Sequence, residues 1–332
     1  MKICISRPDS IGDVILTLPI VTYLNQIVPK AEIHFIGRSY TSPIIQLHAG
    51  IKKVLILDDL LKDGEKGLLE SLKKESYTHI IHVFPHKMLA KAAKKAGIKH
   101  RIGTSHRLIH WTTCNHRINF TRKNSDLHEA QLNFHLLRPF GIKDIPDLKE
   151  LSFGDDIKNM NSDNLDFESL KISSNRKKLI LHPKSQGSAV EWGVENFIAL
   201  AEIAEKQNYL VLFTGTENEA PFFRHLIPES DNIVDLSGKL SLEQLITLIQ
   251  RAEGIVAAST GPLHIGGMMN IKAVGLFSPR RPIHPGRWQP LGEKSRALLD
   301  NPDCEKCKQG KPCNCIQNIR PETVLEVLKS IK

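Results

Sequence analysis

The sequence predicts an α/β protein built from two doubly wound parallel sheets. Short apolar runs typical of buried strands alternate along the chain with segments of helical apolar spacing. Strands that alternate with helices form a parallel sheet whose two faces are both covered. The alternation stops over residues 142–177 and then restarts, and 332 residues exceed the usual size of one domain. We therefore expect two domains joined by a linker.

In the first domain, expected over residues 1–160, apolar runs predict strands at residues 2–6, 33–36, 54–57, 80–84 and 101–103. Helices are predicted at residues 14–27, 40–48, 87–96 and 126–140. The first of them has apolar side chains three or four residues apart, from Ile15 to Ile27, as one face of a helix requires. Gly141 ends the last one, because glycine readily adopts the left-handed conformation that closes a helix.

The linker is expected over residues 161–177, where polar residues are scattered without apolar periodicity. In the second domain, residues 178–318, strands are predicted at residues 178–182, 210–214, 233–236, 254–258 and 273–277. Helices are predicted at residues 194–207, 217–226, 241–251 and 262–270, and a C-terminal helix at 321–331 has Pro321 at its start. Each half has about the length of one doubly wound domain.

The net charge of +9 is concentrated in one stretch of the first domain. Residues 76–125 contain ten Lys or Arg and seven His but no Asp or Glu, so this stretch carries +10 and the rest of the chain sums to −1. Such a patch attracts phosphate-rich partners, namely nucleic acid, anionic lipid or an acidic substrate. Residues 87–99 also fit a solvated helix face, whereas the His and Arg residues that follow fit it poorly.

Cysteine usage and apolar run lengths indicate a cytoplasmic protein. No apolar run reaches membrane-spanning length, and residues 1–5 lead directly into a strand instead of a signal peptide. Four of the six cysteines, Cys304, Cys307, Cys313 and Cys315, lie close together near the C-terminus. Four clustered thiolates in a reducing compartment suit a structural Zn²⁺ ion, while free thiols and disulfides remain open alternatives.

Gly12 and Asp13 follow the first strand, at the edge where parallel sheets place ligands. Gly12 permits close approach of a ligand to the backbone, and Asp13 lies at the beginning of a helix. A carboxylate in that position is either a general base or a residue that stabilises the helix dipole. Neither Gly-x-Gly-x-x-Gly nor a Walker Gly-Lys-Ser/Thr signature occurs, so a dinucleotide oxidoreductase or P-loop enzyme is not supported.

A second candidate site follows the strand at residues 254–258. Ser259 or Thr260 is a plausible N-cap there, and Pro262 suits the start of the next helix. Free backbone N–H groups and the positive end of the helix dipole make such a helix start a phosphate site, to which His264 adds a donor. The alternative is an ordinary strand-to-helix turn with a satisfied histidine.

Two other strand ends in the second domain carry polar residues. Lys184 and Ser185 follow the strand at residues 178–182, and Glu217 follows the strand at 210–214. Lys and Ser suit an anionic ligand, and Glu217 is either an acceptor for ribose hydroxyls or an exposed first-turn residue. Because parallel strands bring their carboxyl ends to one edge, we expect these residues to meet the phosphate site. The basic loop at residues 279–288 either folds over a phosphate or wraps the surface.

Two motifs together resemble a known family. Ser10-Ile11-Gly12-Asp13-Val14 with Thr17-Leu18-Pro19 is similar to the N-terminal signature of the heptosyltransferases, glycosyltransferase family 9. Thr260-Gly261-Pro262-Leu263-His264 resembles the second signature of that family. Between them, the segments that match in order are Arg101-Ile102-Gly103, His182 with Trp192, and Leu240-Ser241-Leu242.

The resemblance implies a GT-B fold, in which two Rossmann-like domains face each other across a cleft and the C-terminal helix, residues 319–332, packs back on the first domain. It also implies an inverting transfer of heptose from ADP-heptose to the lipopolysaccharide inner core, with no metal or other cofactor in catalysis. Helix-terminal N–H groups and basic side chains then stabilise the leaving diphosphate. The implied partners are a nucleotide-diphosphate sugar, an anionic glycolipid acceptor and the surface of the inner membrane, with which the protein associates peripherally.

The resemblance also assigns roles to residues. Asp13 is the implied general base, Glu217 contacts the adenosine ribose, and Leu240 lines the adenine pocket. The implied donor site further contains Lys184, Ser185, Ser259, Thr260, Gly261, Pro262 and His264. The expected acceptor residues are Gly12, Arg101, His106 and Arg107.

Two positions depart from the family pattern, both on the donor side. Ser259 stands where the lipopolysaccharide-core enzymes have Asp, and Val190 stands where they have Lys, for which Lys184 is the candidate substitute. The donor sugar is therefore a heptose or a related sugar. The alternatives are a sugar-nucleotide epimerase on the same scaffold and a non-catalytic nucleic-acid binder. Because few aromatic residues accompany the basic stretch, no nucleic-acid partner is expected.

Overall fold

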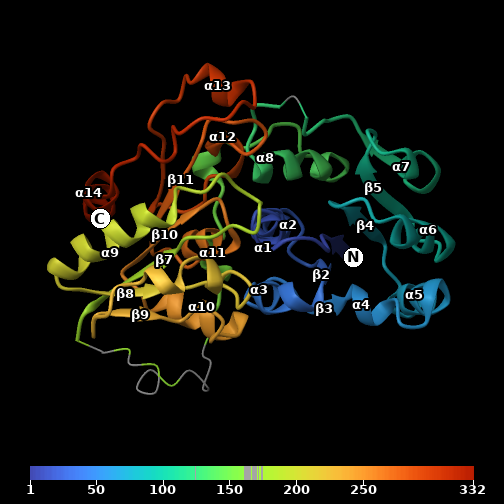
Figure 1. Cartoon of the computed structure of the whole chain (residues 1–332). Helices are drawn as coiled ribbons and strands as arrows, with labels where there is room; N and C mark the ends of the chain where they lie inside the picture. Colours follow the sequence, from blue (N-terminus) through green and yellow to red (C-terminus); the bar gives the residue numbers. More distant parts are fainter. Residues whose placement is uncertain (124, 161–165, 167–169, 171, 173–174) are drawn as a thin grey trace. The chain divides into compact units, whose positions relative to one another are not determined.

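The computed structural model describes residues 1–332 except 124, 161–165, 167–169, 171 and 173–174. The chain divides into two compact units, Met1–Lys158 and Asn159–Lys332 (Figure 1). Each unit contains one six-stranded sheet in which all strands are parallel. The predicted α/β class with two doubly wound domains is confirmed. The predicted linker at residues 161–177 lies largely outside the described residues.

The sheet of the first unit has the strand order β3-β2-β1-β4-β5-β6. Its strands are β1 (Lys2–Ser6), β2 (Glu32–Gly37), β3 (Lys53–Ile56), β4 (His79–His82), β5 (His100–Thr104) and β6 (His116–Ile118). The helices are α1 (Ile11–Ile15), α2 (Leu18–Ile27), α3 (Ser42–Gln46), α4 (Leu57–Leu60), α5 (Gly64–Glu75), α6 (Lys87–Lys95), α7 (Leu108–Thr113) and α8 (Glu129–Phe134). Short 3₁₀ helices are η1 (Ser39–Thr41), η2 (His135–Phe140), η3 (Leu148–Glu150) and η4 (Gly154–Asp156).

The central strand β1 is buried on both faces, as its uninterrupted apolar sequence predicts. Cys4 points to one face, where it joins a core cluster with Leu68 and Leu72 of α5 and Leu89 of α6. Side chains alternate along a strand, so Ile3 and Ile5 point to the opposite face, and both are completely buried. This core holds the carboxyl end of β1 in place, and the Asp13 segment follows from it.

The second unit repeats the architecture with the order β12-β11-β10-β7-β8-β9. Its strands are β7 (Lys177–His182), β8 (Tyr209–Phe213), β9 (Ile233–Asp235), β10 (Gly254–Ala258), β11 (Lys272–Leu276) and β12 (Ser295–Leu298). The helices are α9 (Val194–Lys206), α10 (Leu242–Gln250), α11 (Gly261–Met268), α12 (Pro285–Trp288), α13 (Glu305–Lys308) and α14 (Pro321–Ser330), with the 3₁₀ helices η5 (Ala220–Phe222) and η6 (Arg224–Leu226).

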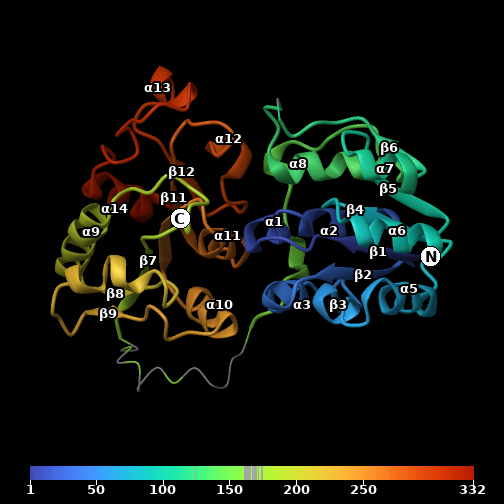
Figure 2. The same cartoon turned by 45° about the vertical axis from the view of Figure 1, so that its right-hand side comes forward.

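The C-terminal helix α14 packs on the core of the second unit. Its buried residues Val324, Leu325 and Leu328 belong to the main core cluster of the second unit, together with Trp192 and Phe197. Figures 1 and 2 show α14 beside α9, and α14 also contacts β11. The apolar stripe of α14 is thus buried in the second unit, and packing of residues 319–332 on the first domain stays a prediction.

Several elements differ from the sequence-based expectation. The helix predicted at 14–27 is two helices, because α1 ends with Leu16 as its C-cap and Thr17 is the N-cap of α2, which has Pro19 in its first turn. The segment predicted as a helix at 217–226 contains only the two 3₁₀ helices η5 and η6, with a proline inside η5. Helix α5 was not predicted, because its apolar face is narrow and reduces to Leu68 and Leu72 as buried residues.

Among the described residues, no helix has both the length and the apolar character needed to span a membrane.

Candidate active site

Each sheet reverses its strand order beside its first strand, between β1 and β4 in the first unit and between β7 and β10 in the second. In open α/β sheets, ligands bind outside the carboxyl ends of the strands at such a switch point. The Asp13 segment follows β1, while residues 183–188 and 259–264 follow β7 and β10. The polar motifs found in the sequence therefore lie at the switch points of their own sheets.

Asp13 is held by two neighbours in the first unit. Its Oδ1 forms an ion pair with the guanidinium of Arg7, and its Oδ2 accepts a hydrogen bond from the Ser10 hydroxyl. Arg7 is the first residue after β1, and Asp13 lies one helical turn beyond Ser10, which is the N-cap of α1. The Asp13 side chain remains 19% exposed, so a substrate hydroxyl can reach it. A fixed, partly exposed carboxylate of this kind can act as a general base.

Arg7 is the centre of a buried charge network. It is 4% exposed, and its Nε donates to Asp9 Oδ1 at 2.8 Å. Its Nη1 lies 3.3 Å from Oε1 of Glu129, which is completely buried and also accepts from Arg122 Nε at 2.8 Å. Burial alone would lower the pKa of Arg7, but the three carboxylates outweigh it and raise that pKa. The guanidinium therefore stays charged and holds Asp13 in one orientation.

The same buried network changes the pKa of Asp9. Burial raises the pKa of Asp9 to about 7, against the opposing attraction of Arg7. Tyr40 anchors the Asp9 backbone by donating its hydroxyl hydrogen to the Asp9 carbonyl at 2.7 Å. Neither Arg7 nor Glu129 was found from the sequence. Arg7 could have been found as the basic residue directly after the first strand, whereas Glu129 lies 122 residues away from it.

The expected acceptor residues do not all meet. Gly12 is buried in α1, next to Asp13. His106 and Arg107 are exposed and follow β5, at the same edge of the sheet as Asp13. Arg101 lies near the amino end of β5, and its guanidinium is used on the backbone carbonyls of Ile98 and Thr113. Through Ile80 of β4, Arg101 lies level with Cys4 in the middle of β1, so it is not at the carboxyl edge with Asp13, and its side chain supports the backbone.

In the second unit, α11 begins directly beyond β10. Thr260 is its N-cap, and Pro262 lies in the first turn, as the sequence predicts. The Thr260 side chain makes no capping hydrogen bond, and its buried Oγ1 has no partner among the described residues. Gly266 permits close packing of α11 on β10, because a Cβ there would lie 2.5 Å from Cγ2 of Ile255. An unpaired buried hydroxyl at a helix N-terminus is a feature that an anionic ligand would satisfy.

Three loops of the second unit meet at this edge. Ser188 Oγ lies 3.5 Å from the carbonyl oxygen of Ser259, which joins the loop after β7 to the loop after β10. Gln186 Nε2 lies 3.4 Å from Thr216 Oγ1, which joins the loop after β7 to the loop after β8. His264 is 3% exposed in the first turn of α11. The expected convergence of the three strand ends is present.

Lys184 and Ser185 share a partner that the sequence did not reveal. Glu191 forms an ion pair with Lys184 Nζ, and its Oε1 accepts from both the backbone N–H and the hydroxyl of Ser185, each at 3.0 Å. Lys184 also lies over the ring of Phe222, 5.2 Å from its centroid. Glu191 therefore fixes the shape of the loop after β7, and it stands directly before Trp192 in the chain.

Glu217 and Leu240 lie at the adjoining strand ends. Glu217 is 73% exposed at its side chain, and its carboxylate lies against Gly238, where an added Cβ would be 1.8 Å from Oε2. Gly238 has a φ of +74° and donates its N–H to the carbonyl of Gly215 at 2.9 Å. Leu240 is half-buried before Ser241, the N-cap of α10. This brings the two expected nucleoside contacts, Glu217 and Leu240, to neighbouring loops.

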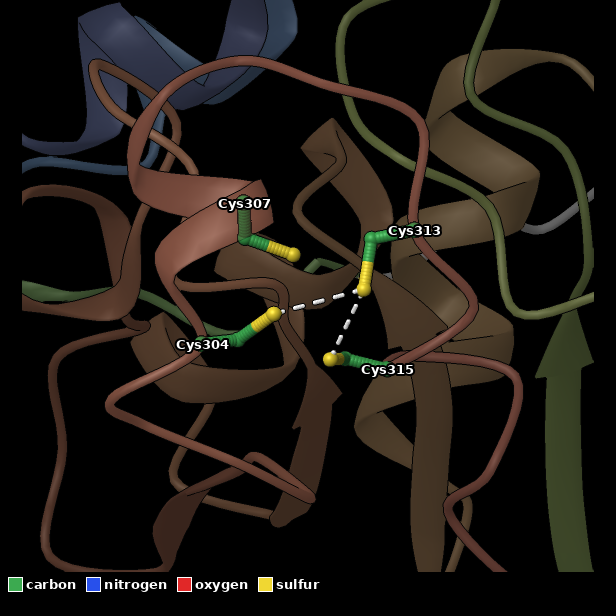
Figure 3. A group of neighbouring side chains, drawn as sticks. All are labelled: Cys304, Cys307, Cys313 and Cys315. Carbon is green, nitrogen blue, oxygen red and sulfur yellow. Dashed lines mark hydrogen bonds between the residues drawn. The ribbon is translucent and has the colours of Figure 1, made fainter.

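The four clustered cysteines form a preformed tetrathiol site (Figure 3). Their sulfur atoms all lie within 4.8 Å of one another, and no disulfide joins them. Cys313 Sγ lies 3.4 Å from that of Cys304 and 3.0 Å from that of Cys315. A hydrogen bond from the Cys307 backbone N–H is the main cause that lowers the pKa of Cys304 to about 7. A site of this composition can hold a metal ion.

Comparison with known proteins agrees with the fold and the motifs. The family model "Glycosyltransferase family 9 (heptosyltransferase)" matches residues 66–316. The lipopolysaccharide core heptosyltransferase OpsX of Haemophilus influenzae is 22% identical over 94% of this chain and 88% of its own. Among solved structures, the E. coli ADP-heptose LPS heptosyltransferase II is 18% identical, with a TM-score of 0.78, over 100% of this chain and 98% of its own. The E. coli heptosyltransferase WaaC with ADP is 15% identical, with a TM-score of 0.76, over 100% of both chains.

The two Rossmann-like units, each with polar residues at its switch point, place this chain in the α/β GT-B fold class, as the sequence resemblance had implied. The chain belongs to glycosyltransferase family 9, the heptosyltransferase family, and is a glycosyltransferase.

Proposed function

We propose that this protein transfers a heptose from ADP-heptose to a lipopolysaccharide or lipooligosaccharide core acceptor with inversion at the anomeric carbon. Two features support the proposal, each at the switch point of its own sheet. One is the unpaired Thr260 hydroxyl at the start of α11, and the other is the Asp13 carboxylate fixed by Arg7. The observation that carries it is the Thr260 hydroxyl, because its burial is costly until a ligand pairs with it.

Asp13 is the general base in this proposal. Its carboxylate takes the proton of the acceptor hydroxyl while that oxygen bonds to the anomeric carbon. The bond from the anomeric carbon to the diphosphate breaks at the same time, and ADP leaves with the electron pair. Attack from the face opposite the leaving group inverts the anomeric configuration. Arg7 and Ser10 orient the carboxylate so that its exposed side meets the acceptor.

The donor binds at the carboxyl edge of the second sheet. The backbone N–H groups at the start of α11, with Thr260, Gly261 and His264, hold the diphosphate, and Ser259 and Pro262 shape the same turn. Lys184 and Ser185 border this turn, and Lys184 adds positive charge near the leaving group. Glu217 contacts the ribose, and Leu240 lines the adenine pocket. The proposed transfer uses no metal ion at the reacting atoms.

In this proposal the acceptor and the membrane surface both bind to the basic stretch of the first unit, residues 76–125. Helices α6 and α7 contact each other, and Lys94 Nζ of α6 donates to the carbonyl of Thr112 in α7 at 2.8 Å. Helix α7 exposes Leu108 and Trp111, which are 89% and 58% exposed. Arg117 lies over the Trp111 ring at 5.1 Å. An exposed apolar pair among basic side chains fits the interface of an anionic bilayer, which supports peripheral association with the inner membrane.

A transfer assay tests the proposal. The full chain is incubated with ADP-heptose and a purified inner-core acceptor, and ADP release, the glycosylated product and its anomeric configuration are measured. We expect stoichiometric ADP and product with inverted configuration. A changed sugar nucleotide formed without acceptor would establish the epimerase alternative. Thermal stabilisation by UDP or GDP in preference to ADP would contradict the assigned donor.

For the four cysteines we propose a structural role as ligands of one Zn²⁺ ion.

A further inference from the structure

The loop that follows β1 carries a second carboxylate beside Asp13. Asp9 and Asp13 both bind the guanidinium of Arg7, Asp9 through Nε at 2.8 Å and Asp13 through Nη2. Nε and Nη2 lie on the same edge of the planar guanidinium group, so the two carboxylates lie side by side. Their side chains are nearly equally exposed, 20% for Asp9 and 19% for Asp13. A sugar ring that presents one hydroxyl to Asp13 therefore also reaches Asp9.

Asp9 has unused hydrogen-bonding capacity. Asp13 uses Oδ1 on Arg7 and Oδ2 on Ser10. The Asp9 side chain uses Oδ1 on Arg7, whereas its Oδ2 makes no hydrogen bond with any described residue. Burial raises the pKa of Asp9 to about 7, so both forms of the carboxyl are present near neutral pH. The charged form accepts a hydrogen bond and the protonated form donates one, and a hydroxyl group can pair with either.

An exposed aromatic ring lies beside the two carboxylates. Tyr40 belongs to η1, which begins two residues after β2, the neighbour of β1 in the sheet. Its hydroxyl donates to the Asp9 carbonyl at 2.7 Å, and 51% of the residue is nevertheless exposed. This hydrogen bond holds Tyr40 against the loop that carries Asp9. Because the polar tip of the side chain is used on the protein, the apolar ring is the part that is open to a ligand.

We infer that Tyr40 and Asp9 form an acceptor seat, in which the Tyr40 ring covers one face of the acceptor sugar and Asp9 Oδ2 binds the hydroxyl next to the one that Asp13 deprotonates. The inference rests on the proposed function, because it takes Asp13 to be the base. It adds a requirement on the substrate, namely a sugar ring with a free hydroxyl on the carbon next to the attacked one. An aromatic ring suits the C–H face of a sugar, and a carboxyl group fixes its orientation through a hydroxyl.

The acceptor seat is built on a rigid base. The backbone N–H of Arg7 donates to the carbonyl of Ile36 at 3.0 Å, which joins the start of the loop to β2. The Arg7 guanidinium also reaches the buried Glu129. Pro8, between Arg7 and Asp9, has a fixed φ. Partners that are held in place before binding lose little conformational freedom, so the contacts contribute more fully to affinity.

The first experiment measures acceptor binding by calorimetry, with a lipid-free inner-core oligosaccharide and with an analogue that lacks the hydroxyl next to the attacked one. We expect the wild type to bind the analogue about tenfold more weakly, because one hydrogen bond is lost. Asp9→Ala should bind both ligands equally, about tenfold more weakly than the wild type binds the complete oligosaccharide. Wild-type protein that binds the two ligands equally would overturn the contact with Asp9, and this result needs no variant to fold.

The second experiment tests the ring with the same oligosaccharide. Tyr40→Ala should raise its Kd by about tenfold, whereas Tyr40→Phe, which keeps the ring, should stay within about threefold of the wild type. The control is Asp59→Ala, which removes an exposed carboxylate of α4 that pairs with Lys62 at 2.8 Å and should bind as the wild type does. Wild-type affinity in Tyr40→Ala would overturn the role of the ring.

The acceptor seat and the proposed transfer fail in different ways. If the wild type transfers no heptose from ADP-heptose while its affinity for the oligosaccharide depends on Asp9 and Tyr40, the proposed transfer is wrong and the acceptor seat is supported. If the wild type forms the product while Asp9→Ala and Tyr40→Ala keep the wild-type KM for the acceptor, the acceptor seat is wrong and the proposed transfer is supported.

Discussion

The guanidinium of Arg7, 4% exposed, forms an ion pair with the carboxylate of Asp13, six residues later in the chain. The same guanidinium reaches Glu129, which is completely buried. One side chain thus connects the proposed base to a carboxylate that has no surface exposed to solvent. The orientation of Asp13 and the stability of the first unit should therefore depend on the same residue.

We expect Arg7→Met to destabilise the first unit by about 3–5 kcal/mol, because it leaves buried carboxylates with an incomplete partner set. Chemical denaturation measures this change in the free energy of unfolding. The matched control is Arg38→Met, which removes an exposed pair with Asp58 at 3.0 Å and should cost less than about 1 kcal/mol. If both substitutions lowered the free energy of unfolding equally, the buried Arg7 network would stabilise the protein no more than an exposed ion pair does.

Thr260→Val should separate binding from stability. The Thr260 hydroxyl is buried without a partner, so its replacement by an isosteric methyl group should leave stability unchanged or raise it by about 1–2 kcal/mol. The affinity for ADP should fall by about tenfold, since one hydrogen bond to the diphosphate is lost. Calorimetry and thermal unfolding measure the two quantities. Thr214→Val is the control, because that hydroxyl pairs with His182 at 3.0 Å and its loss should destabilise the protein.

Buried histidines predict a loss of stability in acid. Burial lowers the pKa of His82 to about 3 and that of His48 to about 4, whereas an unfolded histidine has a pKa of about 6.5. Below about pH 6.5 the unfolded chain binds protons that the folded chain does not. The contribution of these histidines to the free energy of unfolding is therefore fully present above that pH. It falls by about 1.4 kcal/mol per pH unit for each such histidine as the pH decreases toward about 4.

The raised pKa of Asp9 has the opposite effect on stability, because the folded chain keeps a proton on Asp9 between about pH 4 and 7 that the unfolded chain loses. The contribution of a histidine is therefore measured by comparing a variant with the wild type. The slope of the unfolding free energy against pH should decrease by about 1.4 kcal/mol per unit in His82→Asn. An unchanged slope in His82→Asn would mean that this histidine is protonated in the folded protein.

The surface of α7 predicts binding to anionic vesicles. Leu108→Ser with Trp111→Ser should weaken binding to vesicles that contain anionic lipid by at least about tenfold, because two apolar side chains no longer enter the interface. Co-sedimentation measures the loss, and turnover of a water-soluble acceptor should persist. Leu226→Ser, at another exposed leucine, is the control and should bind as the wild type does. Equal binding of all variants would remove α7 from the membrane contact.

Much of the fold follows from sequence periodicity. Strands such as residues 254–258 are short, uninterrupted apolar runs, and they appear in the structure as β10 with the same bounds. Edge elements were missed because their signal is weak: β6 has three residues with one apolar side chain, and α5 buries only Leu68 and Leu72. The partner of α14 was also not predictable from local pattern, since an apolar stripe does not say which core it enters.

In the candidate site, too, the sequence predicted some residues and not others. The motifs at Asp13 and Thr260 were found because polar residues interrupt the chain where a strand ends. Arg7 pairs with Asp13 and Glu191 pairs with Lys184 within the same loops, but no sequence pattern marks these pairs. Glu129 is brought to Arg7 only by packing of α8 in the first unit.

The role of Asp13 as the base is tested most directly by the turnover of Asp13→Asn with saturating ADP-heptose and acceptor. We expect kcat to fall by at least about 100-fold, because the general base is removed, while the Kd for ADP stays within about twofold of the wild type. Turnover at the wild-type rate, with ADP affinity intact, would contradict the assignment of Asp13 as the base.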